Sequence, residues 1–212
     1  GRNLSATHAA LSSSRVMATC AILGQAVGEA AAIAVRESLS PREVYEKRIG
    51  ELRQALMDAD CYLPWARRAI PELTRNVRLS ASSGDPEPLR NGLDRPLEGA
   101  DNAWAGTPGA SWVQYAFDRP RRVRRLRFVF DSDLNRTEKN QPKHYPLNEP
   151  LYGPPATLVR GFRVEALGPR GEWREIAKVE NNYQRLVWID AEIETPALRF
   201  IPDSTWGASE AR

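Results

Sequence analysis

The hydrophobic pattern of this chain changes near residue 76, where helical spacing gives way to strand-like alternation. Beyond that point, apolar runs rich in β-branched and aromatic residues follow one another, separated by turns that contain Gly, Pro or Asn. No helical period of useful length interrupts them, which predicts an antiparallel β-sandwich. The predicted strands cover residues 77–82, 111–117, 123–131, 158–167, 173–179, 185–191 and 197–202.

The first 35 residues differ, because a polar Ser/Thr-rich loop runs into a segment of very small side chains. Gly24 and Gly28 lie in that segment among alanines. Glycine is about 1 kcal/mol less favourable than alanine inside a helix, so two glycines need a packing reason. We expect a helix along whose Gly24/Gly28 face another backbone or a flat ligand approaches. Thr19 is predicted to cap the start of this helix through its hydroxyl.

A second helix is predicted over residues 41–59. Ser40 is its expected cap, Pro41 suits the first helical position, and Glu43 completes a capping box. Apolar residues then recur at helical spacing, which predicts an amphipathic helix. They are Val44, Ile49, Leu52, Leu56 and Met57.

Composition limits the remaining possibilities. The chain is 42% hydrophobic and 27% charged with a net charge of +3, as in a soluble globular protein, and the charge indicates no particular partner. Its two cysteines, Cys20 and Cys61, are too few for a disulfide framework or an iron–sulfur site. No metal site is expected. No signal peptide or transmembrane helix is visible, and the longest apolar run, residues 30–35, is far shorter than the roughly 20 residues of a membrane span. Because the true N-terminus is expected to be absent, this says nothing about secretion.

The N-terminal motif also carries a family resemblance. The segments GRNLSATH at residues 1–8 and RVMATCAILGQAVGEAAA at residues 15–32 resemble the closing segment of bacterial FAD-dependent oxidoreductases of the glutathione-reductase-like superfamily. The resemblance implies that this loop and helix end a flavin-binding domain, with the helix N-terminus directed at the pyrimidine edge of the isoalloxazine ring. There the helix dipole and free N–H groups would stabilise negative charge on the reduced flavin.

The same resemblance implies which residues lie at the flavin. Four residues at the start of the helix are expected to contact it, mainly through backbone N–H groups: Met17, Thr19, Cys20 and Ala21. Cys20 at a helix N-terminus could also have a lowered pKa, although a redox role would require a second thiol nearby. A buried free thiol is the preferred interpretation of Cys20.

Arg15 and His8 are the candidate catalytic residues. In related flavoenzymes of the fumarate-reductase type an arginine before the terminal helix faces the substrate, so Arg15 is expected to hold a carboxylate or stabilise an oxyanion. The alternative is an ion pair with a structural acid. His8 suits proton transfer at neutral pH, and its alternative role is that of a hydrogen-bonded scaffold residue. Arg2 departs from the family, in which many members carry an acid that binds the ribityl chain.

A phosphate-binding G-x-G-x-x-G turn, which a flavoenzyme of this kind needs, is absent. Gly99-Ala100 and Gly106-Thr107-Pro108-Gly109 lack the spacing and a following helix. We therefore expect a C-terminal fragment of a larger oxidoreductase, inactive alone, with FAD held by the full-length protein and not by this fragment. Its expected partners are the remainder of its own FAD domain and a small-molecule substrate that the residues do not identify.

The β-rich part resembles a discoidin-like, galactose-binding-type jelly roll. The resemblance is carried by LSAS at residues 79–82, NGLD at residues 91–94 leading to Trp104, and WVQYAF at residues 112–117. It departs from that family at residues 206–212, where one more strand would usually follow. The resemblance implies a glycan- or surface-binding module as an alternative function, and a purely structural domain as a third.

Some aromatic and acidic residues of this part are candidates for ligand binding. Five tryptophans are candidates for stacking on a sugar, although core positions are the preferred interpretation and Trp112 in particular is expected in the core. Asp94 and Asn102 are candidates for a calcium loop, a role that discoidin-like modules suggest. The five tryptophans are Trp104, Trp112, Trp173, Trp188 and Trp206.

The arginine-rich run at residues 119–127 invites a nucleic-acid interpretation. However, Leu126 and Phe128 share one face of a predicted strand while Arg125 and Arg127 share the other. We therefore predict a solvated face paired with acids and no nucleic-acid partner.

Taken together, the sequence predicts an α+β chain in two parts. Residues 1–65 are expected to be the helical end of a flavin domain, residues 66–74 a linker, and residues 75–212 the jelly-roll β-sandwich. Neither a membrane partner nor a particular compartment or oligomeric state is indicated.

Overall fold

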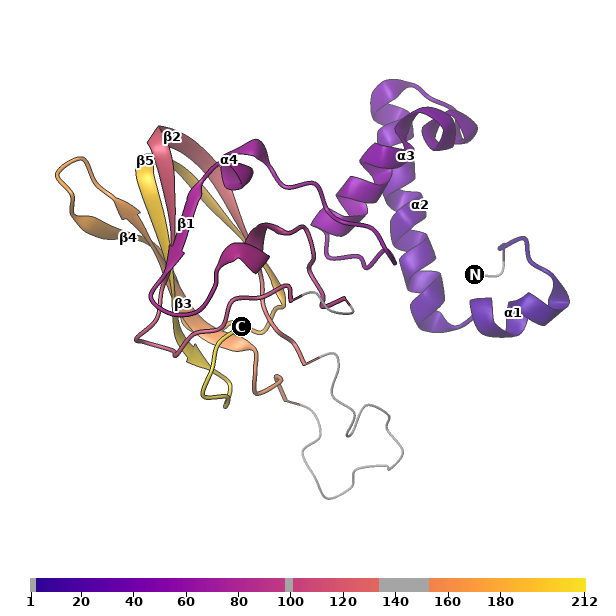
Figure 1. Cartoon of the computed structure of the whole chain (residues 1–212). Coiled ribbons are helices and arrows are strands. Elements are labelled where there is room, and N and C mark those ends of the chain that lie inside the picture. Colours follow the sequence, from indigo (N-terminus) through magenta and orange to yellow (C-terminus); the bar gives the residue numbers. More distant parts are fainter. Residues whose placement is uncertain (1–2, 98–100, 134–152) are drawn as a thin grey trace, which may run out of the picture. The chain divides into compact units, whose positions relative to one another are not determined.

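The computed structural model describes residues 3–97, 101–133 and 153–212 of the chain (Figure 1). The chain divides into two compact units, Gly1–Ala69 and Ile70–Arg212, and each is described by itself. The first contains three helices and the second a five-stranded antiparallel sheet with short helical turns. The predicted α+β class is confirmed. Arg2, Gly99 and Ala100, which figured in the sequence predictions, lie outside the described residues.

The polar N-terminal stretch contains a helix that the sequence analysis did not predict. Helix α1 spans His8–Ser14, and the hydroxyl of Thr7 accepts a hydrogen bond from the backbone N–H of Ala10 at 3.3 Å. Threonine at this position satisfies one of the N–H groups that a helix start leaves without a partner. In the described part of this stretch, only residues 3–7 and the two residues between α1 and α2 remain non-helical.

Helix α2 spans Met17–Glu37 and begins three residues earlier than predicted. Its N-cap is Val16, whose side chain makes no capping hydrogen bond, so the predicted capping role of Thr19 is wrong. Thr19 is already the third helical residue, because the chain turns directly from α1 into α2 through Arg15 and an extended Val16. The helix ends where Ser38 adopts a left-handed conformation with φ of 54°.

Helix α3 spans Pro41–Asp58 and starts as predicted. The Ser40 hydroxyl accepts from the Glu43 N–H at 3.3 Å, while a Glu43 carboxylate oxygen accepts from the Ser40 N–H at 2.9 Å. Both halves of the capping box are therefore formed.

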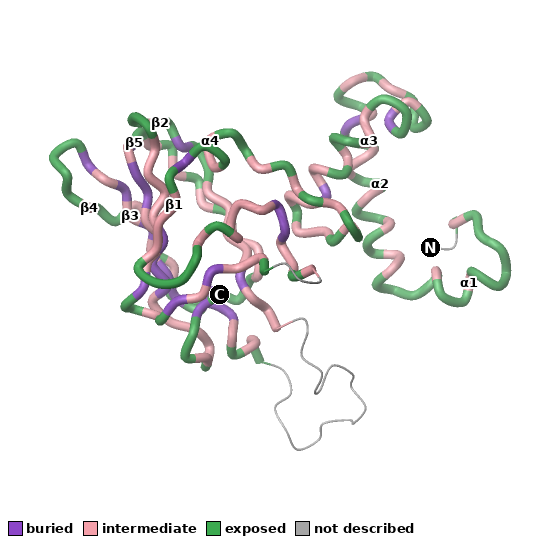
Figure 2. Tube along the Cα trace, in the orientation of Figure 1, coloured by how far each residue is buried: buried purple, intermediate pink, exposed green. Residues whose placement is uncertain are grey.

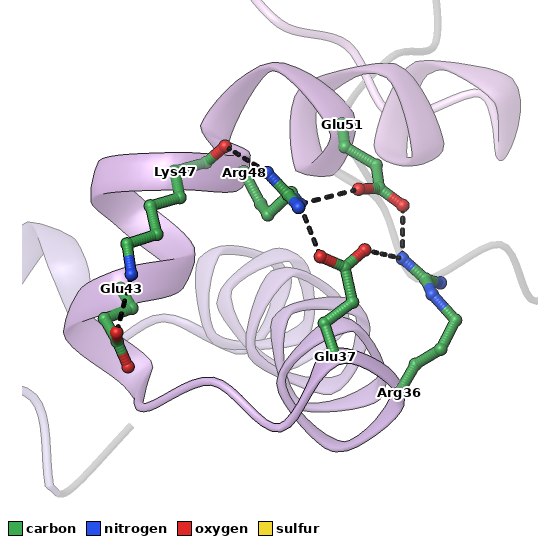
Figure 3. Close-up of polar contacts among 6 residues, drawn as sticks. All are labelled: Arg36, Glu37, Glu43, Lys47, Arg48 and Glu51. Carbon is green, nitrogen blue, oxygen red and sulfur yellow. Dashed lines mark hydrogen bonds and ion pairs between the residues drawn. The ribbon is translucent and has the colours of Figure 1, made fainter.

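Few side chains are buried where α2 and α3 pair, and ionic contacts supplement them. The buried residues are Ile33 on α2 and Val44 and Leu56 on α3. Figure 3 shows a closed set of four alternating charges, in which Glu37 accepts from Arg36 at 3.3 Å and from Arg48 at 2.5 Å. Glu51 completes the set by pairing with both arginines.

Helix α2 is longer and more apolar than the sequence analysis recognised. By length and composition it could cross a membrane, a property that the core helices of soluble proteins share. Glycines and single polar residues interrupt its apolar runs, so no single run shows the low polarity of the helix as a whole. Within the helical unit α2 is mostly exposed, including Met17 at 91% and Val35 at 82%.

The second unit is a single hydrogen-bonded sheet with the strand order β1-β2-β5-β3-β4. Each neighbouring pair is antiparallel. Two pairs of predicted strands turn out to be continuous: residues 111–117 and 123–131 belong to β2, and residues 185–191 and 197–202 belong to β5. The strands are β1 Arg78–Ala81, β2 Val113–Val129, β3 Val159–Leu167, β4 Trp173–Val179 and β5 Leu186–Thr205, with the short helices α4 Glu72–Arg75 and η1 Glu87–Arg90.

The two long strands fold back to make two layers. Phe128 pairs with Val187 on β5, whereas Phe200, further along β5, pairs with Val113. On a straight strand residues 187 and 200 would be roughly 40 Å apart, yet the rings of Phe128 and Phe200 are 5.4 Å apart. One half of the β2–β5 ribbon therefore packs over the other. The β2–β5 register shifts between Ala116 and Arg121, which locates the corner.

Four phenylalanine rings fill the space between the layers. Phe162 is fully buried on β3 and lies 5.2 to 5.6 Å from the rings of Phe128, Phe130 and Phe200. In Figure 2 the buried residues of the sandwich lie mainly on the strands that carry or adjoin these rings, β2, β3 and β5. Aromatic rings at such distances contribute beyond their buried area, so this cluster is the main apolar support of the sandwich.

We predict that Phe162→Ala destabilises the sandwich by about 3 to 5 kcal/mol, because it leaves a cavity among three rings. Chemical denaturation of the full chain, followed by tryptophan fluorescence, measures the change. Tyr183→Ala, at a side chain that is 64% exposed, is the control and should change stability by less than about 1 kcal/mol. Equal effects of the two variants would contradict the assignment of Phe162 to the core.

The capping box of α3 predicts a pH dependence. The Lys47 ammonium, and then the Ser40 N–H, lower the pKa of Glu43 from 4.5 to about 2. A lowered pKa stabilises the fold above the unfolded value of 4.5, and this contribution is lost as the pH falls through about 2. NMR should therefore show the Glu43 carboxyl titrating near pH 2, with the first turn of α3 fraying over the same range.

Glu43→Gln is the control for this titration. It should remove the pH dependence of the first turn of α3 while leaving the pairing of Arg48 with Glu37 in place. A titration of Glu43 at the ordinary value for glutamate would show that the capping box does not form in solution.

Candidate functional site

The junction between α1 and α2 holds most of the residues predicted to serve a flavin. Arg15 ends α1, its N–H donating to the Leu11 carbonyl at 3.1 Å, and Val16 leads into α2. Because no side chain caps α2, the N–H groups of its first turn have no side-chain acceptor. In contrast to α3, whose start carries a capping box, the start of α2 therefore keeps backbone hydrogen-bond donors available.

The predicted flavin-contacting residues all lie in the first turn and a half of α2. Met17 and Ala21 are exposed, whereas Thr19 and Cys20 are partly buried. The Cys20 thiol lies 3.8 Å from the carbonyl oxygen of Ser14, a weak hydrogen bond to the end of α1. This contact joins the two helices at the junction.

The two candidate catalytic residues are not brought together. Arg15 is exposed, and no acid among the described residues pairs with it, so its alternative role in a structural ion pair has no support here. His8 is the first residue of α1 and is also exposed. A seven-residue helix separates the two by on the order of 10 Å, so His8 and Arg15 occupy opposite ends of α1.

The glycines of α2 lie on an open face. A Cβ atom built at Gly24 or Gly28 would meet no described atom within 4 Å. The close approach that the sequence analysis expected at these positions is therefore not made within the described part of the chain. The residues present suit FAD in one respect, since the uncapped N–H groups of α2 can bind an electron-rich ring edge.

The tryptophans of the sandwich occupy four different environments. Trp104 is buried, donates to the Ser83 carbonyl at 2.7 Å and closes over Gly106, where a Cβ would lie 2.4 Å from its ring. It therefore anchors a loop and offers no exposed platform. Trp188 is 45% exposed and lies between the guanidinium groups of Arg125 and Arg127.

Trp112 and Trp173 stack on one arginine. The Arg199 guanidinium lies 4.6 Å from the Trp112 ring and 4.0 Å from the Trp173 ring. The prediction that Trp112 is a core residue is wrong: it is only partly buried, because it precedes β2 and lies beside Arg199 and not among the phenylalanines. Stacking of an arginine on tryptophan rings covers apolar surface on the outer face of the sheet.

The two calcium candidates are Asp94 and Asn102. Asp94 forms an ion pair, and the contacts of Asn102 do not indicate a ligand role. Both carboxylate oxygens of Asp94 accept from Arg127, at 2.7 and 3.1 Å, in a largely buried bidentate pair. Asn102 donates its backbone N–H to the Asp101 carboxylate at 2.8 Å. No group of three metal-ligating side chains occurs among the residues that the structure describes.

Acids pair with four arginines of the basic run, which confirms that part of the prediction. The pairs are Arg121 with Asp118, Arg122 with Glu192, Arg125 with Asp190 and Arg127 with Asp94.

An exposed aromatic cluster lies where β4 leads into β5. The Tyr183 ring packs against the Trp206 ring at 4.7 Å, and the Arg160 guanidinium lies 4.9 Å from the same indole. Arg160 donates twice to the side-chain oxygen of Asn181, at 3.1 and 3.2 Å. We call these four residues the Tyr183 cluster.

Buried Asn182 fixes the turn that carries this cluster. Its side-chain amide donates to the carbonyls of Val159 and Gln184 at 2.9 and 2.8 Å. Its backbone carbonyl accepts from the Trp206 indole N–H at 2.7 Å. Three separate segments are thereby joined, which gives Tyr183 a defined place despite its 64% exposure.

Trp206 is one of the tryptophans that the sequence marks as candidates, whereas its neighbours in the cluster are not predicted from the sequence. Asn181, Asn182 and Tyr183 lie in a segment interpreted only as a turn between strands. The one available signal was an aromatic residue directly after two asparagines, where turns favour small polar residues. Arg160, distant in sequence, could not be assigned to this turn without the strand pairing.

The solved structures to which the chain is similar include the following β-sandwich modules. One is the family 32 carbohydrate-binding module of Streptococcus pneumoniae EndoD, with 15% identity, a TM-score of 0.46 and coverage of 66% of this chain and 93% of that one. Another is chitosan-binding module 1 of a Paenibacillus sp. IK-5 chitosanase/glucanase, with 14% identity, a TM-score of 0.43 and coverage of 67% and 92%. The third is CpGH89CBM32-5 of Clostridium perfringens, solved with GalNAc-β-1,3-galactose, with 10% identity, a TM-score of 0.42 and coverage of 65% and 92%.

The helical unit has a likeness of a different kind. No curated protein matches the chain. A protein-family model does match: residues 1–56 are similar to the FAD dependent oxidoreductase family, which confirms the resemblance of the first 35 residues and extends it through most of α3.

Proposed function

We propose that the helical unit is the closing segment of the flavin-binding domain of an FAD-dependent oxidoreductase. The family match over residues 1–56 carries this proposal. The uncapped start of α2 supports it, because N–H groups without side-chain acceptors are the donors that a flavin ring edge requires. FAD, when bound, supplies hydride or electron transfer.

In this proposal the chain's own residues bind and orient. The first-turn N–H groups from Met17 to Thr19 donate to the ring edge, and the positive end of the α2 dipole favours negative charge there. Arg15, exposed at the end of α1, holds an anionic group of the substrate beside the ring. His8 lies at the far end of α1 and serves as part of the scaffold.

The exposed apolar surface of α2 supports a further part of the proposal. The remainder of a flavin domain would cover this surface and approach the open face at Gly24 and Gly28. Four large apolar side chains of α2 are more than half exposed, and burial under such a cover would remove them from water. On α2 they are Met17, Ile22, Val27 and Val35.

We predict that Ala18→Asp lowers the flavin reduction potential in the product of the complete gene. Ala18 is the second residue of α2, where an acid stabilises the helix itself but opposes negative charge on the flavin. We expect a fall of roughly 10 to 30 mV for a two-electron couple, measured by spectroscopic redox titration.

Arg42→Asp is the matched control, because Arg42 is the second residue of α3 and is also exposed. It should leave the potential unchanged. Equal shifts in the two variants would overturn the placement of α2 at the flavin. A gene product without flavin absorption, even after FAD is added back, would overturn the proposal as a whole.

A second function, saccharide binding by the sandwich, is favoured by the Tyr183 cluster. Its exposed tyrosine is supported by an indole and surrounded by amide and guanidinium groups, which suits a ligand with both C–H faces and hydroxyls. This function does not depend on the helical unit.

We predict that the chain is retarded in native gels that contain a polysaccharide it binds, and that Tyr183→Ala removes the retardation. Gels should be cast with a panel of neutral and acidic polysaccharides. Trp188→Ala is the control, since Trp188 is an exposed aromatic residue of the sandwich outside the Tyr183 cluster and lies beside two arginines. Unchanged mobility in every gel would contradict saccharide binding.

A further inference from the structure

The Tyr183 cluster has the properties of a prepared binding surface. Tyr183 projects from a turn whose backbone and side-chain amides are used internally, so little order remains to be imposed when a ligand binds. Trp206 packs against the core on one side and supports Tyr183 on the other. The exposed ring is therefore held in place, in contrast to an isolated surface tyrosine.

Arg160 distinguishes this surface from the other arginine–tryptophan contacts of the sandwich. Beside Trp188, Arg125 pairs with Asp190 and Arg127 with Asp94, so carboxylates compensate both cations. Arg160 is held only by the neutral amide of Asn181, and no carboxylate pairs with it within the described ranges. The adjacent acid, Glu180, pairs with Lys178 at 2.8 Å.

An oriented and uncompensated guanidinium favours an anionic partner. Its Nε and one Nη2 hydrogen are bound by Asn181, while its remaining N–H groups are available to a carboxylate. The Tyr183 ring and the Arg160 guanidinium lie 4.7 and 4.9 Å from the same indole, so they are at most about 10 Å apart, a distance that a short oligosaccharide spans. A single cation is too little charge for a nucleic acid, which is bound by neutralising many phosphates.

We propose that the Tyr183 cluster binds an acidic saccharide, a uronic acid unit whose ring packs on Tyr183 and whose carboxylate pairs with Arg160. This inference rests on the proposal that the sandwich binds saccharides, and it adds the charge of the ligand and the residue that recognises it. Asn181 acts as a positioning residue, because it fixes the direction of the guanidinium.

Calorimetric titration of the full chain tests this inference. The probes are short oligomers of galacturonic, glucuronic and mannuronic acid, each compared with the neutral oligomer made by reducing its carboxyl groups. At least one acidic oligomer should bind about tenfold or more tightly than its neutral counterpart, as expected for a charge-assisted pair. Arg160→Gln should abolish that preference, whereas Tyr183→Ala should weaken both members of the pair.

Arg125→Gln is the matched control, because the Arg125 guanidinium also lies against a tryptophan ring. It should leave all affinities unchanged, and equal losses in Arg125→Gln and Arg160→Gln would show unspecific attraction and overturn the inference. Equal binding of acidic and neutral oligomers that Tyr183→Ala removes would overturn the acidic ligand but retain saccharide binding. Binding of no oligomer would overturn both.

Discussion

The sandwich depends on the contact between Phe128 and Phe200, which brings distant parts of two strands together. Because these rings meet 5.4 Å apart, β2 and β5 must bend at their middles and present two halves to each other. The fully buried Phe162 then closes the cluster from β3. Once the two layers are formed, stacked arginine and tryptophan side chains cover the outer faces, and the turns lie at the strand ends.

Local features of the sequence predicted their structures well, and nonlocal ones did not. The capping box of Ser40 and Glu43 is contained within four residues, so its prediction needed no tertiary information. Thr19 failed as a cap because the preceding segment forms α1, which moves the start of α2. The β2 and β5 segments were predicted, but their continuity depends on packing across the layers. Tyr183 and Arg160 meet only through strand pairing, which no spacing rule reveals.

The two units suggest two kinds of recognition, one at a helix start and one at a strand end. At α2 the donors are backbone N–H groups left without side-chain caps, and the family match over residues 1–56 gives them a flavin context. At the Tyr183 cluster the donors belong to the Arg160 guanidinium. Asn181 holds this group, and the buried Asn182 fixes the turn that carries Asn181. In both cases unused hydrogen-bonding capacity, more than residue type, identifies the candidate site.

The ionic set between α2 and α3 has a consequence for the behaviour of the units in salt. Two of its members are well exposed, Arg36 at 55% and Glu51 at 43%, so added salt weakens the attraction between them. The ring cluster of the sandwich carries no charge, and strongly hydrated salts such as sulfate strengthen apolar burial. Added sulfate should therefore loosen the helical hairpin while tightening the sandwich, so that one solution condition separates the stabilities of two units in a single chain.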